Sequence, residues 1–272
     1  MSKTANTCEI CPHLCDLSKG VGKCGANPGA YGKITAIALD PIEKKPLKMF
    51  NQGSMILSVG SYGCNLHCPF CQNFEIAVQA APHKGRNAFN QKNINPSELA
   101  TLAKEKIPLG NIGVAYTYNE PLINYEYILD CAREIHAAGL KNVLVTNGFI
   151  NPAPLEKLLP YIDAMNIDLK AFSQEFYKKI GGDVEVVKNT IATAAKACHV
   201  EVTTLVIPDE NEDDIEPIAK WLASLNPKIP FHISRFFPMH NYANLQATSR
   251  ETIFALADIA RKYLTNVFEG NV

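Results

Sequence analysis

The chain has 272 residues, of which 47% are apolar, so it can bury a hydrophobic core and is neither disordered nor fibrous. Its 26 Lys and Arg balance 27 Asp and Glu, so no basic field directs it to nucleic acid or to anionic membranes. The first residues lack the apolar core of a signal peptide, and no apolar run reaches the roughly 18 residues of a membrane span. We expect a soluble, cytoplasmic protein of one or two domains.

Nine cysteines are many for a chain of this size, and seven of them fall into two groups. Four lie within residues 8–24 and three within residues 64–71, while Cys131 and Cys198 stand alone. A secreted disulfide scaffold would be shorter, and an odd number of cysteines leaves one without a partner. The short spacers therefore favour metal thiolates in a reducing compartment, and we interpret Cys131 and Cys198 as small apolar core residues.

The chain divides into an opening segment, residues 1–50, and a longer part, residues 51–272, of different character. Within the opening segment we predict a strand at 33–39 and a charged turn at 40–47, in which Lys44 and Lys45 are solvated. The longer part contains six β-rich apolar runs. They are mostly continuous rather than alternating, as in parallel strands covered on both faces: 55–61, 112–117, 142–146, 164–169, 200–207 and 231–236.

Helical patterns occupy the intervals between these runs and close the chain: 98–106, 122–138, 152–159, 184–197, 213–225 and 249–263. Ser97 is expected to cap the first of these helices and Gly139 to end the second. Six strand–helix units in alternating order predict a parallel sheet with right-handed crossovers. Eight units cannot be counted, so we expect an α/β protein with a partial (β/α)6 TIM-like barrel.

The loop after the first of these strands carries Cys64, Cys68 and Cys71 in the pattern C-x3-C-x2-C. Three thiolates can hold three irons of a [4Fe–4S] cluster, which leaves the fourth iron free to bind a small molecule. A structural zinc site, the alternative, would normally need a fourth ligand. His67 could supply one, but its place inside the spacer would make chelation cramped.

With Phe70 as the aromatic residue before its last cysteine, this triplet resembles the signature of the radical SAM superfamily. The resemblance implies a partial (β/α)6 barrel, a [4Fe–4S] cluster and S-adenosylmethionine (SAM) as cofactors. In that superfamily the open iron binds the amino and carboxylate groups of SAM. Electron transfer then cleaves SAM to methionine and a 5′-deoxyadenosyl radical, which abstracts hydrogen from a substrate.

Later segments resemble the glycyl-radical-enzyme activases. Asn119-Glu120-Pro121 takes the place of the Gly-Gly-Glu element that meets the SAM amino group, although ordinary turn chemistry would also account for it. Thr146-Asn147-Gly148 and Asp168-Leu169-Lys170 resemble the elements that handle the SAM ribose and carboxylate, and His240 resembles a histidine near the adenine. The resemblance thus implies one cofactor-binding set: Phe70, Asn119, Glu120, Asn147, Asp168, Lys170 and His240.

The opening segment places four thiolates within 17 residues, at Cys8, Cys11, Cys15 and Cys24. Four soft ligands can close on Zn²⁺ or hold a second [4Fe–4S] cluster, and the spacing does not separate the two. Either would organise a segment too small for a core of its own. Because four thiolates leave no vacant position for SAM, we expect a separate metal centre.

This four-cysteine segment, together with residues 40–47 and Cys71-Gln72-Asn73, resembles the radical SAM proteins of the AmmeMemoRadiSam system, which are relatives of activating enzymes. Val145 and Thr203 stand where activases tend to have an acid and an arginine. We expect a radical SAM oxidoreductase of the activating-enzyme type, with a flavodoxin or ferredoxin as electron donor. It would activate a glycyl radical enzyme or modify another protein partner.

Two alternatives remain open. The first is radical modification of a small molecule or of RNA, although the balanced charge offers no surface that tracks phosphates. The second is an iron–sulfur electron carrier without SAM chemistry, which would have no need of the acid, amide and lysine residues that follow the strands.

Overall fold

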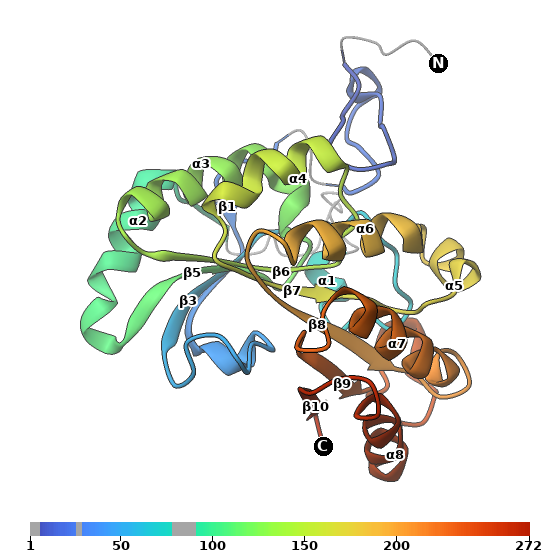
Figure 1. Ribbon diagram of the computed structural model, residues 1–272. Helices are drawn as coiled ribbons and strands as arrows, with labels where there is room; N and C mark the ends of the chain where they lie inside the picture. Colours follow the sequence, from blue (N-terminus) through green and yellow to red (C-terminus); the bar gives the residue numbers. More distant parts are fainter. Residues whose placement is uncertain (1–5, 26–28, 78–90) are drawn as a thin grey trace.

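The computed structural model describes residues 6–25, 29–77 and 91–272 (Figure 1). Its main sheet has eight strands in the order β10-β9-β8-β7-β6-β5-β3-β2. Neighbouring strands from β3 to β10 are parallel, and only β2 runs antiparallel, against β3. The strands are β2 (Ala36–Pro41), β3 (Met55–Gly60), β5 (Asn111–Tyr116), β6 (Lys141–Thr146), β7 (Ala164–Asp168), β8 (His199–Val206), β9 (Phe231–Arg235) and β10 (Val267–Gly270).

The six predicted strands are confirmed as β3 and β5 to β9, each within one residue at either end. The strand predicted at 33–39 is instead divided into β1 (Lys33–Ile34) and β2. The first pairs with β4 (Lys92–Asn93) in a separate two-stranded sheet, and the second forms an edge of the main sheet. Strand β10 was not predicted.

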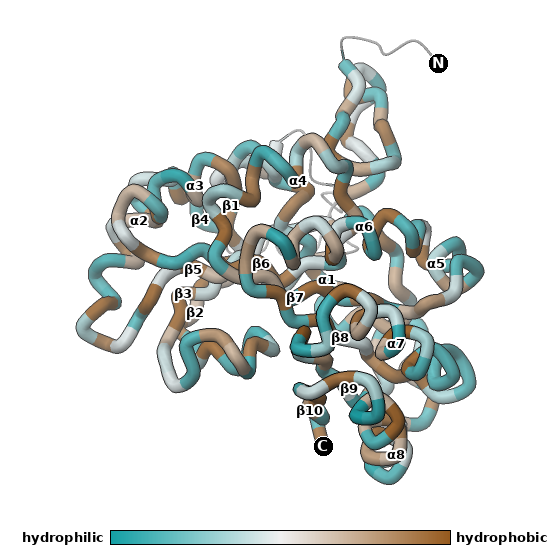
Figure 2. The backbone as a smooth tube through the Cα atoms, viewed as in Figure 1, coloured by the Kyte–Doolittle hydropathy of each residue, from teal (hydrophilic) through white to brown (hydrophobic). Residues whose placement is uncertain are grey.

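Helices follow the parallel strands and cover one face of the curved sheet (Figure 1). They are α1 (Phe74–Ala77), α2 (Pro96–Glu105), α3 (Tyr125–Ala137), α4 (Pro152–Leu158), α5 (Gln174–Lys179), α6 (Val184–Ala194), α7 (Ile215–Leu225) and α8 (Arg250–Ala260). Figure 2 shows apolar residues along the central strands and an alternation of apolar and polar residues in the helices, as expected when one side of each helix packs on a sheet. This alternation of strand and helix is the expected α/β architecture of a partial barrel.

The predicted cap of α2 is wrong by two residues. The side chain of Asn95, not Ser97, accepts from the Glu98 N–H, and the Glu98 carboxylate accepts from the Asn95 N–H in return. Pro96 then occupies the first helical position, where no N–H is needed. The expected end of α3 is confirmed, because Gly139 follows it with a φ of 72°.

The chain between β2 and β3 packs against the face of the sheet that the helices do not cover. Ile42 and Leu47 are fully buried there against Ile56, Ala115, Val143 and Ala164. The Pro46 carbonyl accepts a hydrogen bond from Asn166, and the buried Glu201 carboxylate accepts from the N–H groups of Lys48 and Met49. These contacts fill the interior of the partial barrel below its carboxyl-end opening.

The opening segment contributes to two parts of the molecule. Residues 36–41 belong to the main sheet, whereas residues 6–25 lie beside α4 in Figure 1. Asn151, which precedes α4, bonds to the backbone of Glu9 and Ile10 through its side chain and its N–H. The domain boundary at residue 50 stays a prediction. No helix in the described ranges is long and apolar enough to cross a membrane.

Candidate functional site

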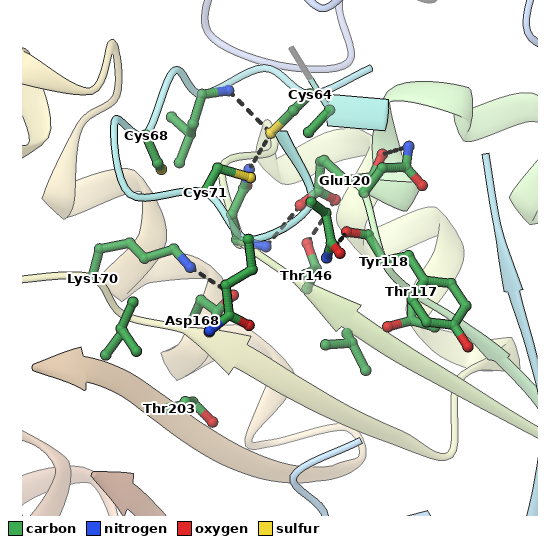
Figure 3. Close-up of a pocket in the computed structure, with 18 of the residues that line it drawn as sticks. Cys64, Cys68, Cys71, Thr117, Tyr118, Glu120, Thr146, Asp168, Lys170 and Thr203 are labelled. Carbon is green, nitrogen blue, oxygen red and sulfur yellow. Dashed lines mark hydrogen bonds and ion pairs between the residues drawn. The ribbon is translucent and has the colours of Figure 1, made fainter. Parts of the chain in front are cut away.

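A cavity of about 350 Å³ opens at the carboxyl ends of the parallel strands. Side chains from four successive strand–helix loops line it, because parallel strands present these ends at one edge of the sheet. Figure 3 shows the three central cysteines around the same space as Glu120, Asp168 and Lys170. Six predicted site residues outside the cysteines also line it: Phe70, Asn119, Glu120, Asn147, Asp168 and Lys170.

The loop after β3 carries the three cysteines. The Cys64 sulfur accepts hydrogen bonds from the Leu66 N–H at 3.4 Å and the Asn147 amide at 3.6 Å. Phe70 is buried against Phe176, with ring centroids 6.1 Å apart, and this contact holds the loop on the barrel wall. Soft thiolates of this number and placement fit a [4Fe–4S] cluster with one iron left open.

Burial raises the pKa of all three thiols, that of Cys68 to about 12 and that of Cys64 well above its ordinary value. The thiols are therefore protonated at neutral pH in the absence of metal. Since metals bind the thiolate, loading this site must release protons.

Glu120, directly before the 3-10 turn Pro121–Asn124, is the buried acid of the cavity. Its carboxylate accepts from the Leu122 N–H at 3.0 Å, the Thr146 hydroxyl at 2.8 Å and the Asn147 N–H at 2.7 Å. Burial nevertheless raises the pKa of Glu120 to about 7, so the charge of this group changes near neutral pH. These bonds also tie the loop after β5 to the loop after β6.

Two asparagines brace the cysteine loop. The Asn119 side chain accepts from the Ser61 N–H at 3.0 Å and donates to the Gly63 carbonyl at 3.1 Å. The Asn147 amide donates to the Asn65 side chain at 2.9 Å as well as to Cys64. Both side chains therefore fix the backbone from which the cysteines project.

Asp168 and Lys170 lie at the carboxyl end of β7 as an ion pair 2.8 Å long. Burial by itself would lower the pKa of Lys170, but the neighbouring Asp168 carboxylate raises it above its ordinary value. The ammonium is thus a fixed positive charge at the cavity, 16% exposed, and Asp168 supplies acceptor oxygens beside it.

His240 is the predicted site residue that does not line this cavity. Its ring stacks on Phe74, with centroids 4.7 Å apart and an interplanar angle of 13°. A role of His240 near the adenine of SAM stays a prediction.

The prediction that Lys45 is solvated is wrong. Its side chain is 3% exposed, pairs with Asp40 at 2.8 Å and lies 4.7 Å from the centre of the Tyr118 ring. The Tyr118 hydroxyl donates to the same carboxylate at 3.0 Å. Lys45 and Tyr118 line the cavity, so this group forms a wall of the site that the sequence reading missed. Its one signal in the sequence was Asp40, an acidic residue that directly follows the strand predicted at 33–39.

Replacing Lys45 by alanine is expected to lower the free energy of unfolding by about 2–4 kcal/mol, because Asp40 would be left buried with weaker compensation. Lys44 is the matched control. It pairs with the same carboxylate at 2.8 Å but is 64% exposed, so Lys44→Ala should cost less than about 1 kcal/mol. Urea unfolding of both variants measures the difference, and equal losses would contradict the burial argument.

The four N-terminal cysteines line a second, small cavity together with His13. Cys8, Cys11, Cys15 and Cys24 thus share one cavity, and the metal centre expected on them stays a prediction. Cys131 is buried in α3, and Cys198 is partly buried before β8.

Residues 58–222 match the model of the radical SAM superfamily. The chain belongs to this superfamily. A protein of Methanocaldococcus jannaschii, MJ0808, is 35% identical over 97% of this chain and 81% of its own length. A putative glycyl-radical enzyme activating enzyme from the same organism is 27% identical over 76% of this chain and 77% of its own.

Among solved structures, a radical SAM methyltransferase from Sphaerobacter thermophilus superposes with a TM-score of 0.57 at 16% identity, over 81% of this chain and 67% of its own. This likeness confirms the fold, a partial TIM-like barrel. The radical SAM family implies an enzyme that uses a [4Fe–4S] cluster and SAM, which the cysteines and polar groups of the large cavity fit.

Proposed function

We propose that this radical SAM enzyme holds its [4Fe–4S] cluster on Cys64, Cys68 and Cys71 and abstracts hydrogen from a protein partner, most concretely a glycyl radical enzyme. Bound together, the cluster and SAM supply the 5′-deoxyadenosyl radical. The observation that carries the proposal is the convergence of the three thiols with Glu120, Asn147, Asp168 and Lys170 on one cavity.

Each polar residue of the cavity recognises a different part of SAM. Glu120 offers a carboxylate to the SAM amino group, and its three hydrogen bonds fix the direction in which it faces. The Lys170 ammonium attracts the SAM carboxylate, while Asp168 accepts from ribose hydroxyls. Asn119 and Asn147 keep the cysteine loop in place, and Phe70 packs beneath it.

The protein substrate is supported by likeness to the putative glycyl-radical enzyme activating enzyme, which extends over three quarters of both chains. Another relative is a (2S)-3-sulfopropanediol dehydratase activating enzyme of Klebsiella oxytoca, which is 26% identical over 40% of this chain. A flavodoxin or ferredoxin would deliver the single electron that the cleavage of SAM consumes.

The test begins with anaerobic reconstitution of the enzyme with iron and sulfide. With SAM and dithionite, we expect 5′-deoxyadenosine and methionine in equal amounts. Adding a glycyl radical enzyme from the same genome, deuterated at glycine, should transfer deuterium to 5′-deoxyadenosine and give a glycyl radical in electron paramagnetic resonance. Cleavage of SAM without deuterium transfer would move the substrate to a small molecule or RNA.

SAM binding should depend on pH through Glu120. With its pKa at about 7, roughly a tenth of this carboxyl is ionised at pH 6 and about nine-tenths at pH 8. Because the ionised form attracts the amino group, the Kd of SAM for the reconstituted enzyme should fall up to about tenfold over this range. Equilibrium binding of radiolabelled SAM measures it. Glu120→Gln should remove most of the dependence, and an unchanged dependence in that variant would assign it to another group.

A further inference from the structure

The four N-terminal cysteines line one small cavity, and the apolar side chains of Ile10, Leu17 and Ile123 line it as well. A backbone bond from the Cys8 N–H to the Cys15 carbonyl, 2.8 Å long, brings the two ends of the first loop together. Cys11 lies within that loop, and the turn from Gly22 to Gly25 returns Cys24 to the same cavity. The fold of this segment therefore serves to gather four sulfurs.

The Cys15 sulfur of this cavity accepts a hydrogen bond from the Lys23 N–H, 3.4 Å long. Donors directed at cysteine sulfur stabilise the thiolate and, in iron–sulfur proteins, tune the cluster that it holds. The same feature occurs at Cys64, whose sulfur accepts from Leu66 and Asn147.

The histidine beside the cavity is engaged elsewhere. The His13 Nε2 lies 2.8 Å from the Asn65 carbonyl oxygen, to which it can only donate. Its ring packs edge-on against Phe149, with centroids 5.4 Å apart. Because the His13 ring is engaged in these contacts, the four cysteines remain as the ligand set. The contact with Asn65 also joins residues 6–25 to the loop that carries the three central cysteines.

The two cysteine groups are in direct contact through the backbone. The Cys64 N–H donates to the Cys24 carbonyl at 3.1 Å, so one residue of each group takes part in a single hydrogen bond. Asn65 adds a further link, because its carbonyl oxygen lies 2.8 Å from the His13 Nε2. The N-terminal cavity thus adjoins the loop that carries the SAM-cluster cysteines.

Redox chemistry distinguishes a cluster from a single ion at this place. Zn²⁺ has no accessible redox change, whereas a [4Fe–4S] cluster exchanges electrons. Because Cys24 is hydrogen-bonded directly to the loop of the SAM-binding cysteines, this position favours the group that can exchange electrons with that loop's cluster.

We infer that Cys8, Cys11, Cys15 and Cys24 hold a second [4Fe–4S] cluster, fully ligated by protein and packed against the loop of the SAM-binding cluster. The inference rests on the proposed function only in assigning the other cluster to the central triplet. A cubane with four protein thiolates has no open iron, so this cluster does not bind SAM.

The test is metal analysis after anaerobic reconstitution. Wild-type protein should hold about eight irons and eight sulfides per chain, and the variant Cys64→Ala/Cys68→Ala/Cys71→Ala should keep about four of each. On reduction, that variant should give the electron paramagnetic resonance signal of a [4Fe–4S]⁺ cluster, and SAM should leave the signal unchanged. About one zinc per chain, or no bound metal, would overturn the inference.

A reciprocal variant covers the case in which the triple variant does not fold. Cys8→Ala/Cys15→Ala should fall from about eight irons to about four, and SAM should still perturb the signal of those that remain. Cys131→Ala, which removes a buried cysteine outside both groups, should retain all eight. Wild-type protein with only about four irons would overturn the second cluster. If wild-type protein holds about eight irons but SAM does not perturb its electron paramagnetic resonance signal, the proposed function would be contradicted and the second cluster would stand.

Discussion

Replacing Cys68 by alanine is expected to reduce the formation of 5′-deoxyadenosine at least about a thousandfold, to the level of the buffer. Two remaining thiolates do not hold a cubane with one open iron, so SAM would lose both its binding position and its source of an electron. Cys68 lines the large cavity together with Cys64, Cys71 and Lys170, and among the described residues no fourth cysteine lines it.

The measurement is 5′-deoxyadenosine by chromatography after anaerobic reconstitution with dithionite as reductant. Cys198→Ala is the matched control, because Cys198 precedes β8 at the amino end of the barrel and does not line the cavity. That control should cleave SAM within about twofold of wild type. A Cys68→Ala enzyme that retains a tenth of the activity would reject the assignment of the cluster to this triplet.

Replacing Glu201 by alanine is expected to lower the free energy of unfolding by about 3–5 kcal/mol. Its fully buried carboxylate accepts from four donors, so the variant would leave all four without their acceptor. They are the ring nitrogens of His199 at 2.9 Å and His232 at 2.5 Å and the N–H groups of Lys48 and Met49. The segment between β2 and β3 would then lose its anchor to β8.

Urea unfolding measures this loss, with Glu185→Ala as the control. Glu185 is 73% exposed and pairs with Lys188, so its removal should cost less than about 1 kcal/mol. Burial alone would raise the pKa of Glu201, but the hydrogen bonds from the two histidines and the two N–H groups hold it at about 2. The stability that this carboxylate contributes is therefore present above pH 4.5 and lost as the pH falls toward 2. A difference between wild type and variant that stays constant down to pH 3 would contradict this explanation.

The strand positions followed from local pattern. In β6 and β8 the buried residues follow one another almost without interruption because both faces of a parallel strand are covered, and these strands are six and eight residues long. The cavity followed from the same pattern, since Glu120 and Asn147 follow predicted strands and Asp168 lies at the end of one. Parallel strands place those ends together whatever the details of packing.

Strand β10 was missed for a reason that is also physical. It has four residues, Val267–Gly270, of which only Val267 is buried, so its local sequence carries little of the strand pattern. It pairs with β9 in register from Val267–Phe231 to Gly270–Ser234, and this pairing alone defines it. The helix cap was misplaced because two nearby polar residues, Asn95 and Ser97, compete for one N-terminus, and Pro96 between them decides for Asn95.

By itself, the sequence determined the class of fold and the cysteine triplet of the radical SAM signature, and it set the four N-terminal cysteines apart as a second group, because each depends on residues close together in the chain. The tertiary structure decided what depends on distant ones. Lys45 is buried because β2 runs antiparallel to β3, which brings Asp40 to Tyr118 across 78 positions. The contact of Cys24 with Cys64 likewise spans 40 positions, and short-range spacing contains no record of it. Burial and long-range pairing are properties of the packed chain, so only the folded molecule shows that the two cysteine groups lie against each other.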